Sequence, residues 1–202
     1  RYGTFVSPRL ALLVRRGAWS SRLSAGTGFY GASVLTEDTE ASGLARLAVP
    51  RALRAERGRS ASLDLTRTAG PFTTTLTLFG SRVRQPLEVS RLGAYTLTNA
   101  AEPATNLGAE VLATFRHEPF ALTATYAHVR SRELDEDGTR QDVPLTPRHS
   151  AGLVAMWERE GAGRVGAEMY YTGLQRLEAN PYASRSEPYV VFGLLVERQL
   201  GP

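Results

Sequence analysis

Hydrophobic and polar side chains alternate along residues 105–131, and this pattern determines how the rest of the chain is interpreted. In the first half the apolar positions are Leu107, Ala109, Val111, Ala113 and Phe115, and the intervening ones include Asn106, Gly108, Glu110, Thr114 and Arg116, with Leu112 among them. A repeat of two residues is typical of a β-strand with one apolar and one polar face. After a tight turn predicted at residues 117–119, the alternation returns with Phe120, Leu122, Ala124 and Tyr126 on one face. The pattern therefore predicts a hairpin of two strands.

Each arm of this hairpin runs for about a dozen residues, which is longer than the ~5–6 residues of a usual strand in a soluble protein. A tilted strand of that length suits the ~25–30 Å of hydrocarbon in a membrane. We therefore interpret the hairpin as two strands of an outer-membrane barrel.

The same alternation recurs along the chain. It predicts further strands near residues 9–14, 19–27, 60–68, 72–78, 151–157, 164–171 and 190–196. Short turns and long connections follow one another in strict alternation, provided that the strand-like YTLTN at 95–99 lies within a long loop. Residues 30–55 read mainly as loop, with a short helix around 43–47. The predicted fold is all-β, an antiparallel transmembrane β-barrel segment of about nine to ten strands, because tight turns on one side and long loops on the other are typical of such barrels.

Aromatic residues lie beside every predicted short turn. They are Trp19, Phe72, Phe115, Phe120 and Trp157. By strand parity all of them belong to the apolar face, which favours an aromatic girdle at one membrane interface. The alternative is that these aromatic residues simply join hairpin ends in a soluble sheet.

The composition argues against a disordered chain, a helical membrane protein and a nucleic-acid-binding protein. The chain is 22% charged and 42% hydrophobic, which excludes wholesale disorder, and its longest apolar runs are far shorter than the ~20 residues of a transmembrane helix. The net charge is +4, but the arginines are scattered, so we expect no nucleic-acid partner. The absence of cysteine excludes disulfides and thiolate metal sites. Because the chain begins at Arg1 without a signal-peptide pattern, we expect a mature product or part of a longer protein.

A set of segments, taken in order, resembles the TonB-dependent outer-membrane receptor family. They are SPRLAL (7–12), RLSAGTGFYGASVLTEDTE (22–40), LFGSRV (78–83), YTLTN (95–99) with NLGAEV (106–111), TATYAHVRS (123–131) and VPLTPRHSAGL (143–153). The resemblance spans nearly the whole chain, and it implies a barrel of about 22 strands closed by a plug. It also implies uptake of a scarce ligand, such as a siderophore or other metal complex, a vitamin or a saccharide, with energy passed on by TonB.

This chain departs from the full family pattern. It has no plug, no TonB-contact segment and no C-terminal aromatic residue, so residues 1–202 are expected to form an internal to C-terminal part of the barrel domain. The expected partners are outer-membrane lipid and lipopolysaccharide, the plug and remaining strands, TonB and a small-molecule ligand, in the outer membrane of a Gram-negative bacterium. Because an open sheet would leave two unpaired edges in lipid, we expect that the isolated segment cannot insert as a closed pore.

Charged side chains on the polar face are assigned by the resemblance to the lumen lining and to plug contacts. They are Arg22, Asp64, Glu110, Arg116, Arg164 and Glu168. A plain solvated sheet face is the alternative interpretation. Ligand contacts are expected in the long loops and on the plug, with Tyr30, Tyr95, Tyr182 and loop arginines as candidates.

Three short motifs suggest a cofactor site, a catalytic site or a metal site, but the residues around each motif do not fit that function. GTGFYG at 26–31 matches a dinucleotide fingerprint but lacks a following helix. His149 and Ser150 are adjacent, so on a strand they face opposite sides and cannot form a catalytic pair. The acidic residues of DEDG at 135–138 lack the spacing of a calcium loop. We therefore predict no catalytic residue, cofactor or metal site, and no enzyme activity.

Two other functions stay open at this point. One is a small complete outer-membrane barrel with a structural or hydrolytic role, and the other is a soluble all-β binding module. A soluble module would show its strands as two stacked sheets.

Overall fold

The computed structural model describes residues 4–31, 48, 50, 53–90, 96–134, 138–178 and 180–198. Within these ranges the regular structure is β-strand. None of the described residues belongs to a helix that is long and apolar enough to span a lipid bilayer.

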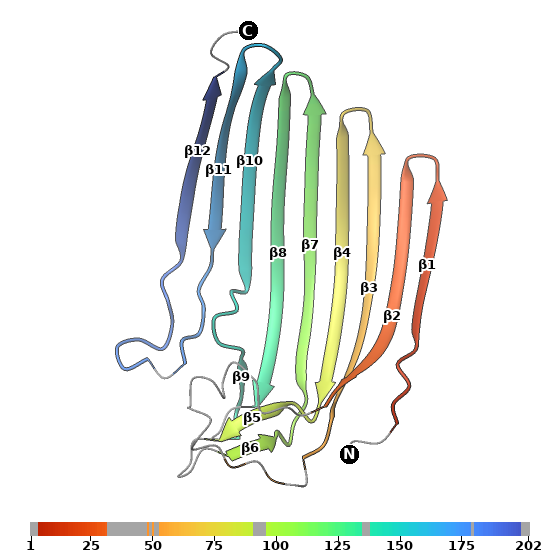
Figure 1. The fold of residues 1–202 in the computed structure, drawn as a ribbon, viewed down its shortest axis with the longest axis vertical. Helices are drawn as coiled ribbons and strands as arrows, with labels where there is room; N and C mark the ends of the chain where they lie inside the picture. Colours follow the sequence, from red (N-terminus) through yellow and green to blue (C-terminus); the bar gives the residue numbers. More distant parts are fainter. Residues whose placement is uncertain are drawn as a thin grey trace.

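Nine long strands form one antiparallel sheet (Figure 1). They are β1 (Arg9–Arg16), β2 (Trp19–Tyr30), β3 (Glu56–Ala69), β4 (Phe72–Arg84), β7 (Ala104–His117), β8 (Phe120–Leu134), β10 (His149–Arg159), β11 (Gly163–Thr172) and β12 (Tyr189–Arg198). Strands that are consecutive along this path are neighbours in the sheet, so the path is a meander.

Three short strands lie outside this path. β9 (Arg140–Asp142) pairs with the last residues of β8, while β5 (Leu87–Ser90) and β6 (Thr96–Asn99) pair only with each other. The prediction that residues 96–99 lie within a long loop is therefore confirmed, because β6 takes no part in the large sheet. Tyr95 and the helix expected at 43–47 lie outside the described residues.

Short turns and long connections lie at opposite ends of the sheet, as the alternation predicts (Figure 1). Gly17 and Gly70 each adopt φ of 56° in the first two turns, a left-handed conformation that glycine accepts without steric cost. The third turn contains Glu118–Pro119 with a cis peptide bond. From here on, the two ends are called the turn end and the loop end.

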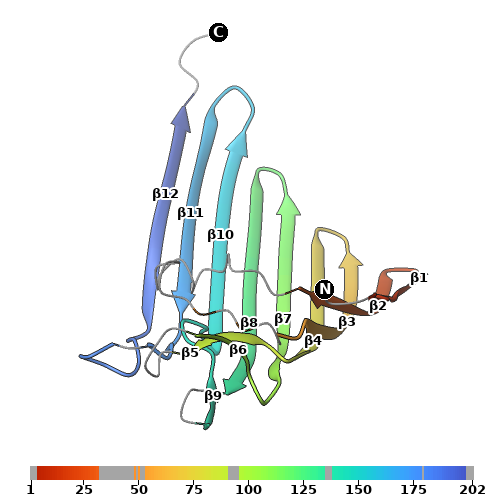
Figure 2. The same ribbon diagram turned by 60° about the horizontal axis from the view of Figure 1, so that its bottom comes forward.

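The sheet is a single curved layer (Figures 1 and 2). The chain exposes 14529 Å², whereas a compact folded protein of this mass exposes about 9,300 Å². Among the described residues the buried apolar side chains are Ala55, Leu97 and Ala100, which lie near the loop end and not within the sheet. The two stacked sheets of a soluble module are therefore not the arrangement that the described residues adopt.

One small polar cluster holds the β5–β6 hairpin against the loop end of β3 and β4. The side-chain amide of Asn99 donates to the backbone oxygens of Arg54, at 2.9 Å, and Gln85, at 2.8 Å. The backbone N–H of Leu87 donates to the carboxylate of Glu56 at 2.6 Å. This connection is thus anchored to the sheet by hydrogen bonds, and the side chain of Leu97 within β6 is buried.

Candidate functional site

The strand register divides the sheet into two chemically different faces. Residues that are directly opposite each other in neighbouring strands point to the same side, so one row of partners defines a face. The row of Phe72, Phe115 and Leu122 marks the side that we call the apolar face. The row of Asp64, Thr77 and Glu110 marks the opposite side, which we call the polar face.

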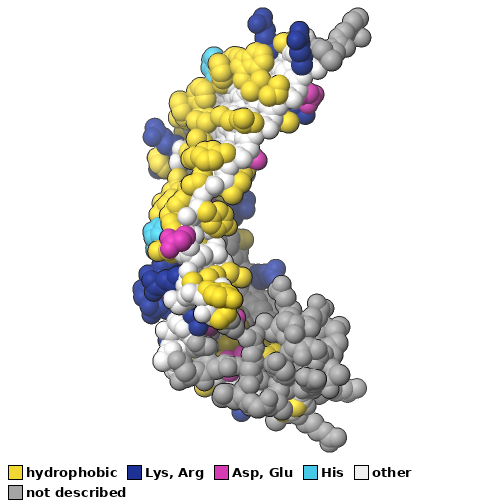
Figure 3. Space-filling model, turned by 90° about the vertical axis from the view of Figure 1, so that its left-hand side faces the viewer, with side chains coloured by type: hydrophobic (Ala, Val, Ile, Leu, Met, Phe, Trp, Pro, Cys, Tyr) yellow, Lys and Arg dark blue, Asp and Glu magenta, His cyan; other side chains and the backbone are white. Residues whose placement is uncertain are grey.

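Hydrophobic side chains cover the convex side of the sheet, which is the apolar face (Figure 3). Large hydrophobic residues there are exposed, among them Leu107, Phe120, Phe192 and Leu194, the last with 86% of its surface accessible. A wet protein surface rarely carries a continuous apolar area of this size, so this face requires a nonaqueous neighbour.

The five aromatic residues predicted beside the short turns all belong to the apolar face. Phe72 and Phe115 are register partners whose ring centroids lie 4.8 Å apart. Phe120 is the partner of Trp157 one hairpin further along, and Trp19 carries the guanidinium of Arg67 at 5.4 Å from its ring centroid. The aromatic residues therefore follow the line of turns, even though the hairpins are staggered in the ladder.

Every carboxylate of the nine long strands has the parity of the polar face. These residues are Glu56, Asp64, Glu110, Glu133, Glu158, Glu168 and Glu197. A random distribution would place some of them on the apolar side. The segregation matches a sheet with water on one side and hydrocarbon on the other.

Two groups of predicted polar-face residues are brought together by the register. Arg22 and Asp64 are cross-strand partners, and the hydroxyl of Thr77 donates to the Asp64 carboxylate at 2.9 Å. Glu110 is the next residue in that row, opposite Thr77. The row is thus a polar strip across four strands.

The second group lies on β11 and β12. Arg164 donates through Nε to the Glu197 carboxylate at 2.8 Å and also forms an ion pair with it at 2.6 Å. The Tyr170 hydroxyl donates to the Glu168 carboxylate at 3.2 Å. Arg116 lies on the same face in β7, apart from both groups.

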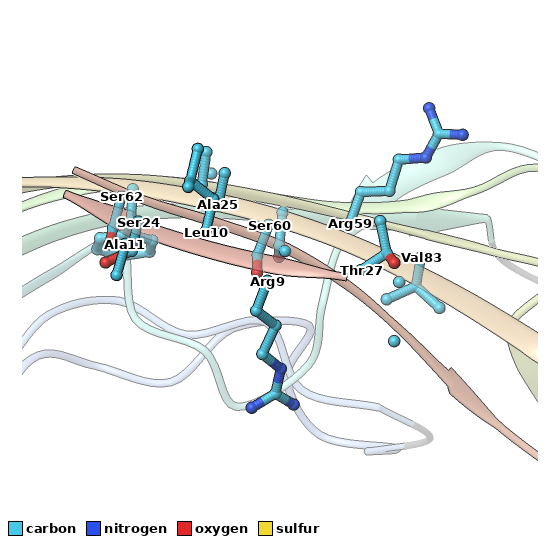
Figure 4. A pocket seen from close by; sticks show the side chains of 17 residues that line it. Arg9, Leu10, Ala11, Ser24, Ala25, Thr27, Arg59, Ser60, Ser62 and Val83 are labelled. Carbon is cyan, nitrogen blue, oxygen red and sulfur yellow. The ribbon is translucent and has the colours of Figure 1, made fainter. Parts of the chain in front are cut away.

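Small residues hollow out the polar face near β1–β4 (Figure 4). A depression of ≈ 670 Å³ is lined by residues that include Ser24, Gly26, Ser60 and Ser62. Leu10, Ala25 and Arg59 project to one side of the sheet there, and Arg9 projects to the other. A second depression of ≈ 460 Å³ lies beside Glu110 and Tyr170.

A third cavity, of ≈ 650 Å³, lies at the loop end between β8, β10 and β11. Asp142 links two arginines on its rim, with oxygens 2.7 Å from Arg148 and 3.7 Å from Arg132. Arg176 and Arg185 also line it. The lining is therefore rich in arginine and holds one carboxylate among the residues that the structure describes there.

His149 and Ser150 face opposite sides, as predicted. The Nδ1 atom of His149 lies 2.7 Å from the Tyr126 hydroxyl, and its ring is 4.7 Å from that of His128. These three side chains are on the apolar face, whereas Ser150 is opposite Thr172 on the polar face. Within the described ranges no cluster of three or more His, Asp or Glu side chains could hold a metal ion.

Some residues of these groups were not predicted from the sequence. Glu197 and Tyr170 are the partners of predicted residues, and strand parity alone could have identified both. Asp142, Arg148 and Arg176 meet through loop folding, for which the sequence gives no periodic signal. Tyr30 lies at the end of β2 and Tyr182 is almost fully exposed, and neither lines any of the three cavities described above.

The sequence matches the family model for the β-barrel of TonB-dependent-receptor-like proteins over residues 1–199. No protein of curated function matches the sequence significantly. Among solved structures, the FrpB iron transporter of Neisseria meningitidis is similar, with 14% identity and a TM-score of 0.75 over 96% of this chain and 32% of that one.

Two further structures show the same fold. The copper transporter OprC has 15% identity and a TM-score of 0.70, over 96% of this chain and 31% of its own. The ferripyoverdine receptor of the Pseudomonas aeruginosa outer membrane has 16% identity and a TM-score of 0.68, over 96% of this chain and 27% of its own. This chain thus spans about a third of the length of these relatives. It belongs to the TonB-dependent receptor β-barrel family, whose members reside in the outer membrane of Gram-negative bacteria.

Proposed function

We propose that this chain forms part of the barrel wall of a receptor that binds a scarce metal chelate outside the cell and imports it with energy from TonB. The observation that carries the proposal is the single curved sheet with an exposed apolar face and all strand carboxylates on the other side, in a chain that matches the receptor family over residues 1–199. Transport and reception, and not catalysis, follow from this assignment.

The ligand class rests on the similar structures. They are described as an iron transporter, a copper transporter and a receptor bound to ferripyoverdine. We therefore infer a metal complex as the cargo, with vitamins and saccharides as the other classes to be tested.

The polar face is proposed to line the lumen and contact the plug. The strip of Arg22, Asp64 and Glu110 supports this role, because these charges lie mid-sheet, where a plugged barrel is filled by protein and water. Arg116, Arg164 and Glu168 are assigned to the same role. The aromatic residues beside the turns are proposed as the girdle at the periplasmic interface.

The experiment is an uptake assay in a strain that lacks the complete receptor. Radiolabelled iron chelates of several chemical types, copper, cobalamin and an oligosaccharide are supplied under limitation, with and without an intact TonB system. We expect loss of energy-dependent uptake of one ligand class and recovery when the receptor is restored. Unchanged uptake of every ligand, or uptake that persists without TonB, would contradict the proposal.

A charge reversal tests the polar strip within the same assay. Glu110→Lys places a cation in the proposed plug contact, so uptake should fall at an unchanged surface level of the receptor. Glu118→Lys makes the same charge change in an exposed turn and serves as the matched control. Equal uptake by both variants would remove Glu110 from the plug contact.

A further inference from the structure

Arginine side chains gather on the apolar face at the loop end. Six have the parity of that face: Arg57 and Arg59 of β3, Arg82 and Arg84 of β4, and Arg130 and Arg132 of β8. We call these residues the arginine belt. Figure 3 shows basic side chains on the convex side of the sheet, beyond the hydrophobic ones toward the loop end.

The belt lies at a constant distance from the turn end. Arg82 follows Phe72 by ten residues and Arg130 follows Phe120 by ten, while Arg59 precedes Ala69 by ten. At about 3.3 Å per residue and a tilt of about 40°, ten residues rise roughly 25 Å. That rise equals the height of the apolar band of an outer-membrane barrel, so the belt begins where the hydrocarbon ends and the headgroups begin.

On β4 and β8 the positions between the two levels carry no charge on this face. On β4 they are Thr74, Leu76, Leu78 and Gly80, and on β8 they are Leu122, Ala124, Tyr126 and His128, whose imidazole is the last ring before the arginines. On β3 the residues of this face between Arg59 and the turn-end Arg67 are Ala61, Leu63 and Leu65, so uncharged positions separate the belt from the turn-end arginines.

Four members of the belt face one another in like-charge pairs. Arg57 is the register partner of Arg84, and Arg59 is the partner of Arg82. Like charges directly opposite each other destabilise a sheet. In the described part of the chain no carboxylate lies within ion-pair distance of Arg59, Arg82, Arg84 or Arg130, and all four are exposed. A bound anion would offset this repulsion.

From this geometry we propose that the arginine belt binds the phosphate groups of anionic lipids in the outer leaflet, with the quartet on β3 and β4 as its centre. The inference rests on the membrane placement of the barrel but not on which ligand is imported. Cross-strand partners lie about 5 Å apart and i,i+2 neighbours about 7 Å apart, so four guanidinium groups can surround the same phosphate cluster. The planar guanidinium donates two parallel hydrogen bonds to a phosphate, which makes arginine the suitable residue.

The loop-end cavity extends this basic surface. Its residues on the long strands are Arg132, His149 and Tyr171, which all have apolar-face parity, and Arg148 stands on its rim. Asp142 neutralises part of the charge there, so the quartet on β3 and β4 is the stronger anion site.

The test uses the complete receptor, purified in a nonionic detergent. Binding of bisphosphorylated lipid A is compared with that of dephosphorylated lipid A, a zwitterionic phospholipid and inorganic phosphate. We expect wild-type protein to bind bisphosphorylated lipid A at least about tenfold more tightly than the other three probes, a difference that two or more charge-assisted contacts supply. Equal affinity for dephosphorylated lipid A would overturn the proposal, as would equal affinity for inorganic phosphate.

Two double variants localise the site. Arg59→Gln with Arg82→Gln should weaken lipid A binding at least about tenfold, whereas Arg16→Gln with Arg67→Gln, on the same face at the turn end, should change it less than about twofold. Equal effects of the two pairs would contradict the assignment. If the first pair does not fold, Arg59→Lys with Arg82→Lys keeps the charge, and its affinity for lipid A should lie below that of the wild type and of the turn-end pair but above a full loss of binding. Unchanged lipid A binding by a folded belt variant would overturn the proposal and would point to a protein partner for the belt instead.

Discussion

At the residue scale, the packing between neighbouring strands requires a glycine where a large side chain from the next strand lies across the backbone. Phe79 of β4 lies over Gly108 of β7 on the polar face, where the two are register partners. A Cβ at Gly108 would collide with the Phe79 ring and come within 2.8 Å of the backbone oxygen of His128. The ring thus fills the space that the missing side chain leaves, and the backbone oxygen cannot move without disturbing the β7–β8 ladder.

Gly108→Ala is therefore expected to destabilise the barrel. Overpacking against a backbone atom costs about 1–3 kcal/mol, which should lower the free energy of unfolding of the complete receptor in detergent by that amount. The control is Gly28→Ala, because no heavy atom lies within 4 Å of the added Cβ there. A loss of stability that is the same for both variants would contradict this packing.

At the element scale, the faces of the strands were predictable and their registers were not. Alternation placed Leu107, Val111 and Phe115 on one side of β7, and the structure confirms that placement through their partners Gly80, Leu76 and Phe72. The shift of one hairpin relative to the next along the strand direction depends on how neighbouring strands pair, and the sequence of a single strand does not indicate that shift. The arginine belt was therefore missed: its members are scattered in the sequence and share a level only when positions are counted from the turns.

Adjacent residues of β8 offer a sharp test of the two faces. Ala124 lies on the apolar face opposite Ala113, and Thr123 lies on the polar face opposite Thr114. Ala124→Arg should cost about 2–4 kcal/mol of folding free energy in a bilayer, because it places a charge in mid-membrane hydrocarbon. Thr123→Arg should cost less than about 1 kcal/mol, since the added guanidinium reaches water. Folding titrations of the complete receptor into lipid vesicles measure both, and a reversed order would exclude the assigned faces.

At the scale of the whole molecule, the sheet is an open piece of wall. Within the described residues β1 and β12 each pair on one side only, so their outer edges carry unpaired backbone groups. In hydrocarbon each such group costs several kcal/mol, which is why the family closes its barrels. Strand length and alternation in the sequence were enough to predict that the sheet must be closed by further strands. The folding of the loops at the loop end was not predictable, because it depends on contacts such as that of Asn99 with Gln85, which follow no periodic pattern.

The central claim is that one face of this wall meets lipid and the other meets an aqueous interior. The chain has no cysteine, so single cysteines can be introduced within it for spin labelling in the complete receptor, reconstituted in lipid. We would label consecutive positions from Asn106→Cys to Phe115→Cys and compare collision rates with oxygen and with a water-soluble nickel chelate. Oxygen collisions should peak at the odd-numbered positions and fall at the even-numbered ones, with a period of two. Collision rates without that period, or nickel collisions that peak at the odd-numbered positions, would contradict the account.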